Sequence, residues 1–396
     1  MAGARPGLIV SAPPLTTGGA TRIVVAGVSQ GAIGAFAYGV PPMAPAGDPP
    51  ISPSLAASVK SAIALVKAGK GEAVQKFSFS NLLIATHWLD HWTFYCGLAS
   101  VAAGEEPRMA DNTHQPGRRS TSETIGALSR IDDTGVRTAL ALAKAGRIYD
   151  LGLELNARIP HNPEFVRFAM SFTHTPEGTG ALSPFQYSVE SVFGPLHIGT
   201  HIDSFIHVQK DGRIYGGHSA SESRDDRGWK RHGIETVPPI IGRAVLLDIP
   251  GLKGLGRLPD RYEVTVDDLR QELVRAHLEI RTGDIVIVRT GKIQDFGDEA
   301  AFQAAEPGVG RKAALWLYDA GMSVLGTDTT GTEPLPFDDP AVTTHGAMLV
   351  EKGVHLIENL NLEDVAREGV REGLFIALPL KITGATGSWI RPVLVI

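Results

Sequence analysis

Three histidines and an aspartate stand close together in the stretch PLHIGTHIDSFIHV, residues 195–208. Even numbers of residues separate the members of this cluster, which are His197, His201, Asp203 and His207. An extended strand would direct all four side chains to one face, and a helix would divide them into two pairs four residues apart. Imidazole nitrogen and carboxylate oxygen are ligands that suit Zn²⁺, Mn²⁺ or Fe²⁺. The spacing therefore predicts a site for a divalent metal ion.

A second group of ligand-type residues lies in the C-terminal half, in the stretch TTHGAMLVEKGVHLIENL, residues 343–360. It contains His345, His355 and Glu358. Glu358 follows an apolar run, where a buried carboxylate needs a partner such as a cation, and the alternative is an exposed residue at a strand end. Because Cys96 is the only cysteine, no thiolate cluster can form, and any metal must be held by histidines and carboxylates.

Alternating strand and helix patterns surround these residues from about residue 120 onward. Period-2 or continuous apolar runs predict strands at 147–155, 242–249 and 283–291. Helices are predicted at 134–146, 265–278 and 310–321, and Thr265 with Asp268 resembles a capping box that begins the second of them. Residues 322–328, 354–369 and 373–388 complete a mixed α/β pattern. We expect one catalytic domain that holds both groups of ligands.

The chain changes character near residue 108. Residues 1–108 carry few charges and much Pro, Gly and Ala, and the polar residues 109–122 predict a linker before a domain at 123–396. Two interpretations of 1–108 stay open: a degenerate α/β-hydrolase-like fragment, or a segment outside the native product, with translation beginning at Met109. The apolar run 81–104 is long enough to cross a membrane, but it carries charged and titratable residues at its middle, so we expect no membrane segment.

The hydrolase-like interpretation rests on Ser29. The sequence GVSQG, residues 27–31, fits G-x-S-x-G between an apolar strand and a helix-like run, as in the nucleophile elbow of α/β-hydrolases. Only about 20 residues precede that strand, too few for the sheet that such enzymes need. A serine hydrolase using Ser29 is therefore a minor alternative.

The stretch HIGTHIDSFIH, residues 197–207, resembles the H-x-G-T-H-x-D-x-P-x-H signature of the metal-dependent cyclase-like hydrolases. That family includes bacterial kynurenine formamidases and isatin hydrolases. The resemblance extends from residue 123 to the C-terminus and is similar to a larger, less characterised branch at 232–249, 326–330, 356–366 and 379–393. It implies an α/β fold, the swivelling β/β/α domain, behind an N-terminal extension of uncertain fold. It also implies a homodimer or homotetramer.

The resemblance implies a role for each matching residue. The metal ligands would be His197, His201, Asp203, His345 and Glu358, holding one or two Zn²⁺ or Mn²⁺ ions per chain, and His207 would shuttle protons. Two departures concern the substrate. Phe205 replaces the proline of the signature, and no tryptophan follows the first strand of the domain, where His161 lies instead. We expect Phe205 and His161 to contact the substrate.

These observations predict a metal-dependent hydrolase that uses metal-activated water to cleave an amide, cyclic amide or lactone bond of a small substrate. Phe172, Phe185, Tyr187 and Phe193 fit either an aromatic-lined pocket or plain core. A kynurenine formamidase proper and a catalytically inactive metal-binding scaffold are the alternatives. The net charge of −6 argues against a nucleic-acid binder, which usually carries a basic face. A single cysteine fits a cytoplasmic protein.

Overall fold

A computed structural model describes residues 8–11, 22–29, 32–39, 122–175 and 187–396. The chain divides into two compact units, Met1–Asn112 and Thr113–Ile396, and each is described by itself. The predicted boundaries of the extension and the linker stay a prediction, and the run 81–104 and Met109 lie outside the described residues. Among the residues that are described, no helix has the length and apolar character needed to cross a membrane.

The first unit contains a three-stranded antiparallel sheet in the order β1-β2-β3, formed by Leu8–Ser11, Arg22–Ser29 and Ala32–Gly39. Ser29 at the end of β2 pairs with Ala32 at the start of β3, so the two strands form a hairpin. The predicted strand before Ser29 is confirmed, but the helix expected after it is wrong. Gly34 and Gly39 make a helix costly there, whereas the aromatic residues fit a strand. The strand–turn–helix context that a nucleophile elbow requires is therefore not formed.

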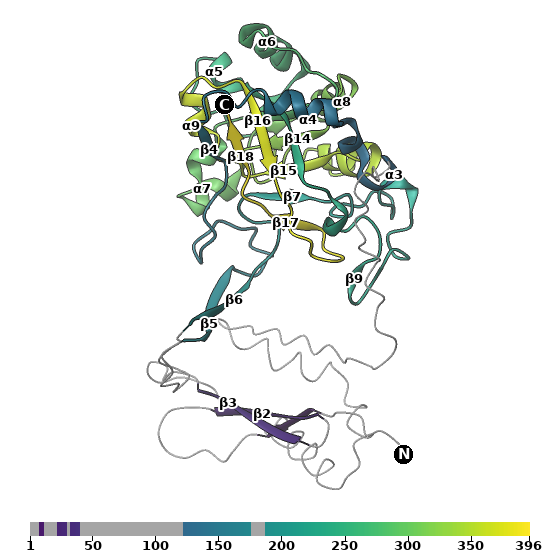
Figure 1. Cartoon of the computed structure of the whole chain (residues 1–396), viewed down its shortest axis with the longest axis vertical. Coiled ribbons are helices and arrows are strands. Elements are labelled where there is room, and N and C mark those ends of the chain that lie inside the picture. Colours follow the sequence, from purple (N-terminus) through teal and green to yellow (C-terminus); the bar gives the residue numbers. More distant parts are fainter. Residues whose placement is uncertain (1–7, 12–21, 30–31, 40–121, 176–186) are drawn as a thin grey trace. The chain divides into compact units, whose positions relative to one another are not determined.

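The second unit is built on a nine-stranded sheet in the order β17-β7-β15-β14-β12-β10-β16-β18-β4 (Figure 1). The four strands from β15 to β10 are parallel to one another, and the outer strands pair antiparallel. The strands are β4 Ile148–Asp150, β7 His201–Asp203, β10 Ile240–Asp248, β12 Ile285–Arg289, β14 Val324–Thr327, β15 His355–Glu358, β16 Glu372–Ala377, β17 Gly387–Trp389 and β18 Val393–Val395. The predicted mixed α/β fold is confirmed.

Short helices and small two-stranded sheets connect these strands. The helices are α3 Ser122–Ile125, α4 Asp133–Leu140, α5 Ile249–Leu252, α6 Val266–Ala276, α7 Glu299–Ala304, α8 Arg311–Asp319 and α9 Glu363–Arg367, with 3₁₀ turns η2 Gly126–Arg130, η3 Tyr215–Gly217, η4 Ile234–Thr236 and η5 Lys292–Asp295, and a π-helix, η6 Gly346–Lys352. The small sheets pair β5 Ala169–His174 with β6 Val189–Phe193, β8 Arg224–Asp225 with β9 Gly228–Trp229, and β11 Glu263–Val264 with β13 Gly308–Val309.

Local signals located several of these elements and misjudged the length of others. The capping box is confirmed, because the Thr265 hydroxyl accepts from the Asp268 backbone while the Asp268 carboxylate accepts from the Thr265 backbone. The helix predicted over 134–146 ends at Leu140, six residues early, and the strand predicted over 147–155 is only Ile148–Asp150. Element ends depend on tertiary packing more than on local pattern, which explains both differences.

The parallel strands are buried on both faces. Along β10, Ala244 and Leu246 belong to one hydrophobic cluster, whereas Val245 and Leu247 belong to the other. Side chains alternate across a strand, so the two clusters lie on opposite faces of the sheet. Helices α6 and α8 contribute buried apolar residues to the second cluster and therefore cover that face. Packing on both faces of the sheet fixes the positions of the strands that carry the candidate site.

The β5–β6 hairpin extends away from the nine-stranded sheet (Figure 1). Its Phe172 and Phe193 are 59% and 57% exposed, and Tyr187 beside it is 49% exposed. This exposure contradicts the interpretation of these three aromatic residues as plain core, and their role in an aromatic-lined pocket stays a prediction. Phe185 lies outside the described residues. The hairpin is left with apolar surface facing solvent.

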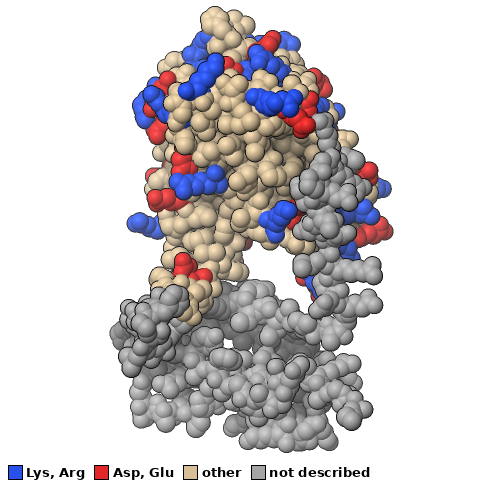
Figure 2. Space-filling model, viewed as in Figure 1, with Lys and Arg blue, Asp and Glu red and all other residues tan. Residues whose placement is uncertain are grey.

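The described surface mixes both signs of charge. On the face seen in Figure 2, Lys and Arg are interspersed with Asp and Glu, with uncharged surface between them. That face has no extended patch of one sign. The exclusion of nucleic acid as a partner stays a prediction.

Candidate metal centre

The site lies where strands β7 and β15 pair. His201 is directly opposite Glu358 in this antiparallel pair, and Ile202 is opposite Ile357. Directly opposite residues project to the same face with Cβ atoms about 4.5–5.5 Å apart, and Asp203, two residues after His201, returns to that face. The strand register therefore brings one imidazole and two carboxylates together from segments more than 150 residues apart.

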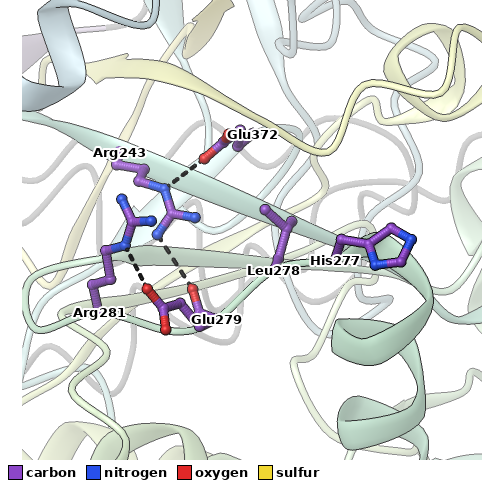
Figure 3. Close-up of a pocket in the computed structure, with 6 residues that line it drawn as sticks. All are labelled: Arg243, His277, Leu278, Glu279, Arg281 and Glu372. Atoms are coloured by element: carbon purple, nitrogen blue, oxygen red, sulfur yellow. Dashed lines mark hydrogen bonds and ion pairs between the residues drawn. The ribbon is translucent and has the colours of Figure 1, made fainter.

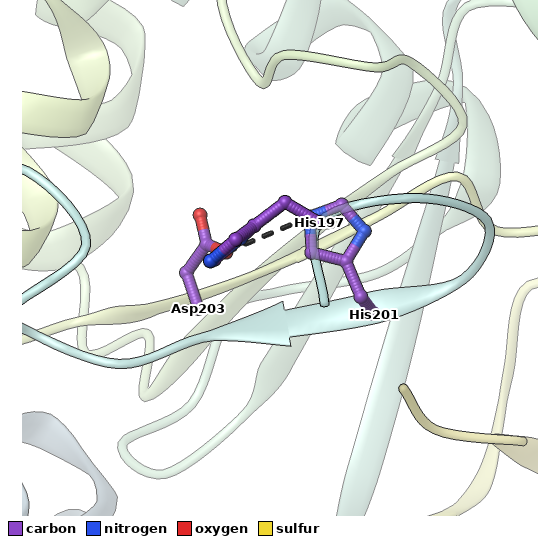
Figure 4. A group of neighbouring side chains, drawn as sticks. All are labelled: His197, His201 and Asp203. Carbon is purple, nitrogen blue, oxygen red and sulfur yellow. Dashed lines mark hydrogen bonds and ion pairs between the residues drawn. The ribbon is translucent and has the colours of Figure 1, made fainter. Parts of the chain in front are cut away.

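His197 enters the site through a turn rather than along the strand. Gly199 has a positive φ of 57°, and a Cβ there would lie 2.8 Å from Leu155 and 2.9 Å from Ile159. The close approach and the left-handed backbone together require glycine at this position. The turn places His197 Nδ1 2.8 Å from Asp203 Oδ1. Figure 4 marks this contact with a dashed line. Neither a long strand nor a helix carries all four residues, since β7 spans only His201–Asp203.

His201 points one ring nitrogen at two carboxylates. Its Nδ1 lies 2.8 Å from the Gly199 carbonyl oxygen, which can only accept, so Nδ1 carries the proton. Its Nε2 lies 3.4 Å from Glu358 Oε2 and 3.5 Å from Asp203 Oδ1. All three groups are nearly fully buried. In the neutral ring a lone pair therefore faces two anionic groups.

His345 completes the arrangement from the other side. It lies at the start of η6, and its Nε2 is 3.2 Å from Glu358 Oε1 and 3.6 Å from Asp203 Oδ2. Its Nδ1 lies 2.6 Å from a carboxylate oxygen of Glu333. The two halves of the chain thus bring their imidazoles to the same pair of carboxylates.

Electrostatics within the cluster favour anionic carboxylates beside cationic partners. Burial opposes ionisation, but the neighbouring His207 and His197 hold the pKa of Asp203 well below its usual range. Likewise His345 and hydrogen bonds lower the pKa of Glu358 to about 2 despite its burial. Burial lowers the pKa of His201 and of His345, yet the adjacent carboxylates outweigh it and raise both pKa values. A cation at this place would satisfy the same carboxylates that these protons otherwise satisfy.

Unpartnered atoms test whether the residues fit a metal ion. Within the described residues, His201 Nε2 and Asp203 Oδ2 are buried polar atoms without a hydrogen-bond partner. The four nitrogen–oxygen separations that His201 and His345 make with Asp203 and Glu358 run from 3.2 to 3.6 Å. Ligand atoms placed tetrahedrally at about 2.0–2.2 Å from Zn²⁺ would be about 3.3–3.6 Å apart. The donor set and its spacing therefore fit a divalent ion.

His207 lies at the more open side of the cluster. Its side chain is 27% exposed, its ring stacks on His197 with centroids 3.7 Å apart, and its Nε2 is 3.9 Å from Asp203 Oδ2. Burial lowers the pKa of His207 to about 4, and the nearby His197 and His345 add to that effect while Asp203 opposes it. The ring is therefore neutral at neutral pH and can accept a proton.

Comparison with known proteins shows what this chain is similar to. Residues 149–334 match the family model described as Cyclase. The chain is similar to this family over those residues. A crystal structure described as a novel cyclase superposes with a TM-score of 0.64 at 27% identity, covering 69% of this chain and 94% of that one. The kynurenine formamidase of Bacillus cereus is 27% identical over 251 residues, covering 63% of this chain and 98% of that protein.

Another relative supports the fold alone. Isatin hydrolase A from Ralstonia solanacearum superposes with a TM-score of 0.50 at 24% identity, covering 65% of this chain and 95% of that structure. The residues that match the family model, 149–334, lie in the second unit of this chain. Three of the predicted ligands, His197, His201 and Asp203, lie within the matched residues 149–334. The other two, His345 and Glu358, follow them.

The residues that the sequence analysis predicted as metal ligands meet in space. His197, His201, Asp203, His345 and Glu358 form one contiguous cluster through the contacts above. Their role as metal ligands stays a prediction. His197 has partners on both nitrogens, since Nε2 is 2.8 Å from Thr386 Oγ1. Binding a metal through its Nδ1 would require that nitrogen to lose its proton.

The two residues expected to contact substrate are buried. Phe205 is 1% exposed, and its ring stacks on His355 at a centroid distance of 4.0 Å. His161 is 6% exposed, and its Nδ1 lies 3.2 Å from Glu299 Oε1 without hydrogen-bond alignment. Their contact with a substrate stays a prediction, which this burial does not favour. His355, left out of the predicted ligand set, donates from Nδ1 to the Asp203 carbonyl oxygen at 2.8 Å.

The sequence-based prediction missed three residues that contact the cluster. Glu333 accepts from His345, Thr332 Oγ1 donates to Glu358 Oε1 at 2.9 Å, and Thr386 contacts His197. Their spacing carries no metal-binding signal, because each acts on a ligand from a distant segment. The polar run GTDTTGTE, residues 326–333, directly after a buried strand was the one available hint.

A separate polar hollow of about 300 Å³ lies elsewhere in the second unit, lined by Arg243, His277, Leu278, Glu279, Arg281 and Glu372 (Figure 3). Arg243 contacts Glu372 and Asp284 at 2.7 Å each, and Arg281 contacts Glu279 at 3.2 Å. Strands β12 and β14 lie between β10, which carries Arg243, and β15. The hollow is therefore not part of the metal centre, and its charges already neutralise one another.

Proposed function

We propose that this chain is a metal-dependent hydrolase that cleaves an amide, cyclic amide or lactone bond of a small substrate. The observation that carries the proposal is the pair of buried carboxylates, Asp203 and Glu358, each within 3.6 Å of both His201 Nε2 and His345 Nε2. Burying two anionic groups is costly unless a cation or bound protons compensate them.

When bound, a divalent ion polarises a carbonyl oxygen and lowers the pKa of water from about 15.7 toward about 7. The chain supplies the rest. Asp203, Glu358, His201, His345 and, after deprotonation, His197 would hold the ion. The ligands are fixed on β7, β15 and η6, so they need little reorganisation during the reaction.

His207 is the proposed proton carrier. It is the most exposed histidine of the cluster, and its lowered pKa leaves the ring neutral and able to take a proton from the attacking water. The protonated ring would then give that proton to the departing nitrogen or oxygen. Its Nε2 lies only 3.9 Å from Asp203 Oδ2, which would stabilise the imidazolium between these two transfers.

We propose Zn²⁺ or Mn²⁺ as the metal, with one or two ions per chain. Nitrogen and oxygen ligands without thiolate support both metals. Two overlapping groups, His197–His201–Asp203 and Asp203–His207–His345, each bring their ligand atoms within 4.8 Å of one another. A second ion would compete with the role of His207 as proton carrier, so metal stoichiometry bears directly on the mechanism.

A kynurenine formamidase proper is the second candidate. The formamidase of Bacillus mycoides is 26% identical over 254 residues, 98% of its length, which supports formyl amides as substrates to test first. Phe205 is buried, and no tryptophan follows the first strand of the domain, so neither position supports the aromatic substrate contact that would favour this specificity.

The test is a hydrolysis screen of formanilides, isatins, cyclic imides and lactones, with Zn²⁺ or Mn²⁺ added after removal of bound metal. We expect turnover of at least one class that a chelator abolishes and metal restores. Stoichiometric metal without any turnover would favour the inactive scaffold. A folded protein that binds neither ion would refute the proposed function. Activity that a serine-directed phosphonate inhibits and a chelator leaves unchanged would favour the alternative of a serine hydrolase using Ser29.

We further propose a homodimer or homotetramer that acts in the cytoplasm. The exposed apolar residues of the β5–β6 hairpin support association, since a lone two-stranded hairpin is at best marginally stable. The single cysteine supports a reducing compartment. Light scattering of the purified full chain and fractionation of cells that produce it would test these two points.

A further inference from the structure

A buried carboxylate outside the predicted ligand set contacts His345. Glu333 is 4% exposed, and its Oε2 lies 2.6 Å from His345 Nδ1 and 3.2 Å from the His345 backbone nitrogen. A carboxylate oxygen accepts, so both nitrogens donate to it. One oxygen atom therefore fixes both the ring and the backbone of His345.

This contact selects which nitrogen of His345 faces the site. A neutral imidazole can carry its proton on either nitrogen, and only a deprotonated nitrogen can bind a metal. With Nδ1–H donating to Glu333, Nε2 is the nitrogen left to face Glu358 at 3.2 Å and Asp203 at 3.6 Å. Without Glu333 the other tautomer and other ring rotations become accessible.

The segment that carries Glu333 is itself held in place. The Glu306 carboxylate accepts from the backbone nitrogens of Thr330 at 2.8 Å and Gly331 at 2.6 Å. The Thr332 carbonyl oxygen accepts from the Val309 nitrogen at 2.7 Å. A Cβ at Gly308 would lie 2.2 Å from the carbonyl carbon of Glu333, so the two backbones touch. Glu333 therefore has a rigid support.

The residue before it contacts the other ligand from the C-terminal half. Thr332 Oγ1 donates to Glu358 Oε1 at 2.9 Å, the same oxygen that lies 3.2 Å from His345 Nε2. Consecutive residues of one rigid segment thus orient both His345 and Glu358.

We propose that Glu333 is a positioning residue that fixes the tautomer and ring orientation of His345 for metal binding, with Thr332 orienting Glu358. This inference rests on the proposed metal-dependent function. Outer partners of metal-binding histidines typically change metal affinity by 10- to 100-fold when replaced. Glu333 acts through His345 and need not touch the substrate.

The experiment compares Glu333→Gln, Glu333→Leu and the control Glu164→Gln in the full chain, with Co²⁺ and Zn²⁺ as probes. Glu164→Gln makes the same chemical change at an exposed residue, so it should leave metal binding unchanged. Glutamine keeps an oxygen that accepts from Nδ1–H but loses the charge. We expect about 10-fold weaker binding with a nearly unchanged Co²⁺ absorption spectrum for Glu333→Gln, and about 100-fold weaker binding with an altered spectrum for Glu333→Leu.

If Glu333 had a purely structural role, the Co²⁺ spectrum would not be kept in Glu333→Gln and altered in Glu333→Leu. Thr332→Val and Thr332→Ser form a second comparison, in which serine restores the hydroxyl and should restore affinity. Glu333→Gln and Glu333→Leu proteins that both bind Co²⁺ with the affinity and spectrum of the unmodified chain would overturn the inference. If Glu333→Leu fails to fold, Glu333→Gln with unchanged affinity overturns it alone. An unmodified chain that binds neither ion would overturn the proposed function instead, before any variant is compared.

Discussion

Replacing Asp203 with asparagine removes one charge at the centre of the site while preserving size. The two carboxylate oxygens lie 2.8 Å from His197, 3.5 Å from His201, 3.6 Å from His345 and 3.9 Å from His207. All four contacts are with imidazoles, and the Asp203 backbone oxygen, which accepts from His355, is unchanged by the substitution. We therefore expect Asp203→Asn to fold and to fail in metal binding.

The size of the loss follows from sharing the binding free energy among the ligands. Structural zinc sites bind with about 10–16 kcal/mol, or about 2.5–4 kcal/mol for each of four ligands. At about 1.4 kcal/mol per factor of ten, losing one charged ligand weakens binding by two to three orders of magnitude. Turnover at limiting metal should fall in parallel.

The assay is chelator competition with Zn²⁺ and Mn²⁺, read alongside circular dichroism and hydrolysis of a substrate found in the screen. Asp226→Asn is the matched control, because Asp226 is exposed at the β8–β9 turn. The control should bind metal as the unmodified chain does. A folded Asp203→Asn protein whose metal affinity stays within threefold of the control would refute the placement of Asp203 at the centre of the site.

Four further predictions follow from particular contacts. His207→Gln should keep its metal and lose about 10²–10⁴-fold in kcat, and single-turnover kinetics with nearly intact rates would exclude His207 as proton carrier. Because the adjacent carboxylates raise the pKa values of His201 and His345, protons compete with a metal ion for both rings. Calorimetry should therefore show proton release on binding and a metal affinity that rises with pH, and an affinity independent of pH between about 6 and 8 would contradict this. Thr265→Ala should lower the free energy of unfolding by about 1 kcal/mol in urea titrations without changing kcat, since it removes only the capping box of α6, and an unchanged unfolding midpoint would count against that role. Phe205→Ala should cost about 3–5 kcal/mol of stability because its ring is buried against His355; normal stability with a raised KM would instead make Phe205 a substrate contact.

Much of the fold could be predicted because short stretches of sequence determine where several helices and strands form. The capping box at Thr265, the apolar run of β12 and the glycine before α8 each specify an element without reference to the rest of the chain. The extent of α4 and β4 could not be predicted in this way, since neighbouring elements decide where they stop. The hairpin after Ser29 shows the same limit, because a short apolar, glycine-containing run fits more than one element.

The sequence by itself determined the chemistry of the site: histidines and carboxylates without thiolates, concentrated at 197–207 and again at 345–358. The tertiary structure alone decided how they meet. The pairing of β7 with β15 sets His201 opposite Glu358, and the left-handed turn at Gly199 returns His197 to Asp203. Glu333 and Thr332 acquire their roles only there, because a hydrogen bond to a ligand from another segment leaves no periodic trace along the chain.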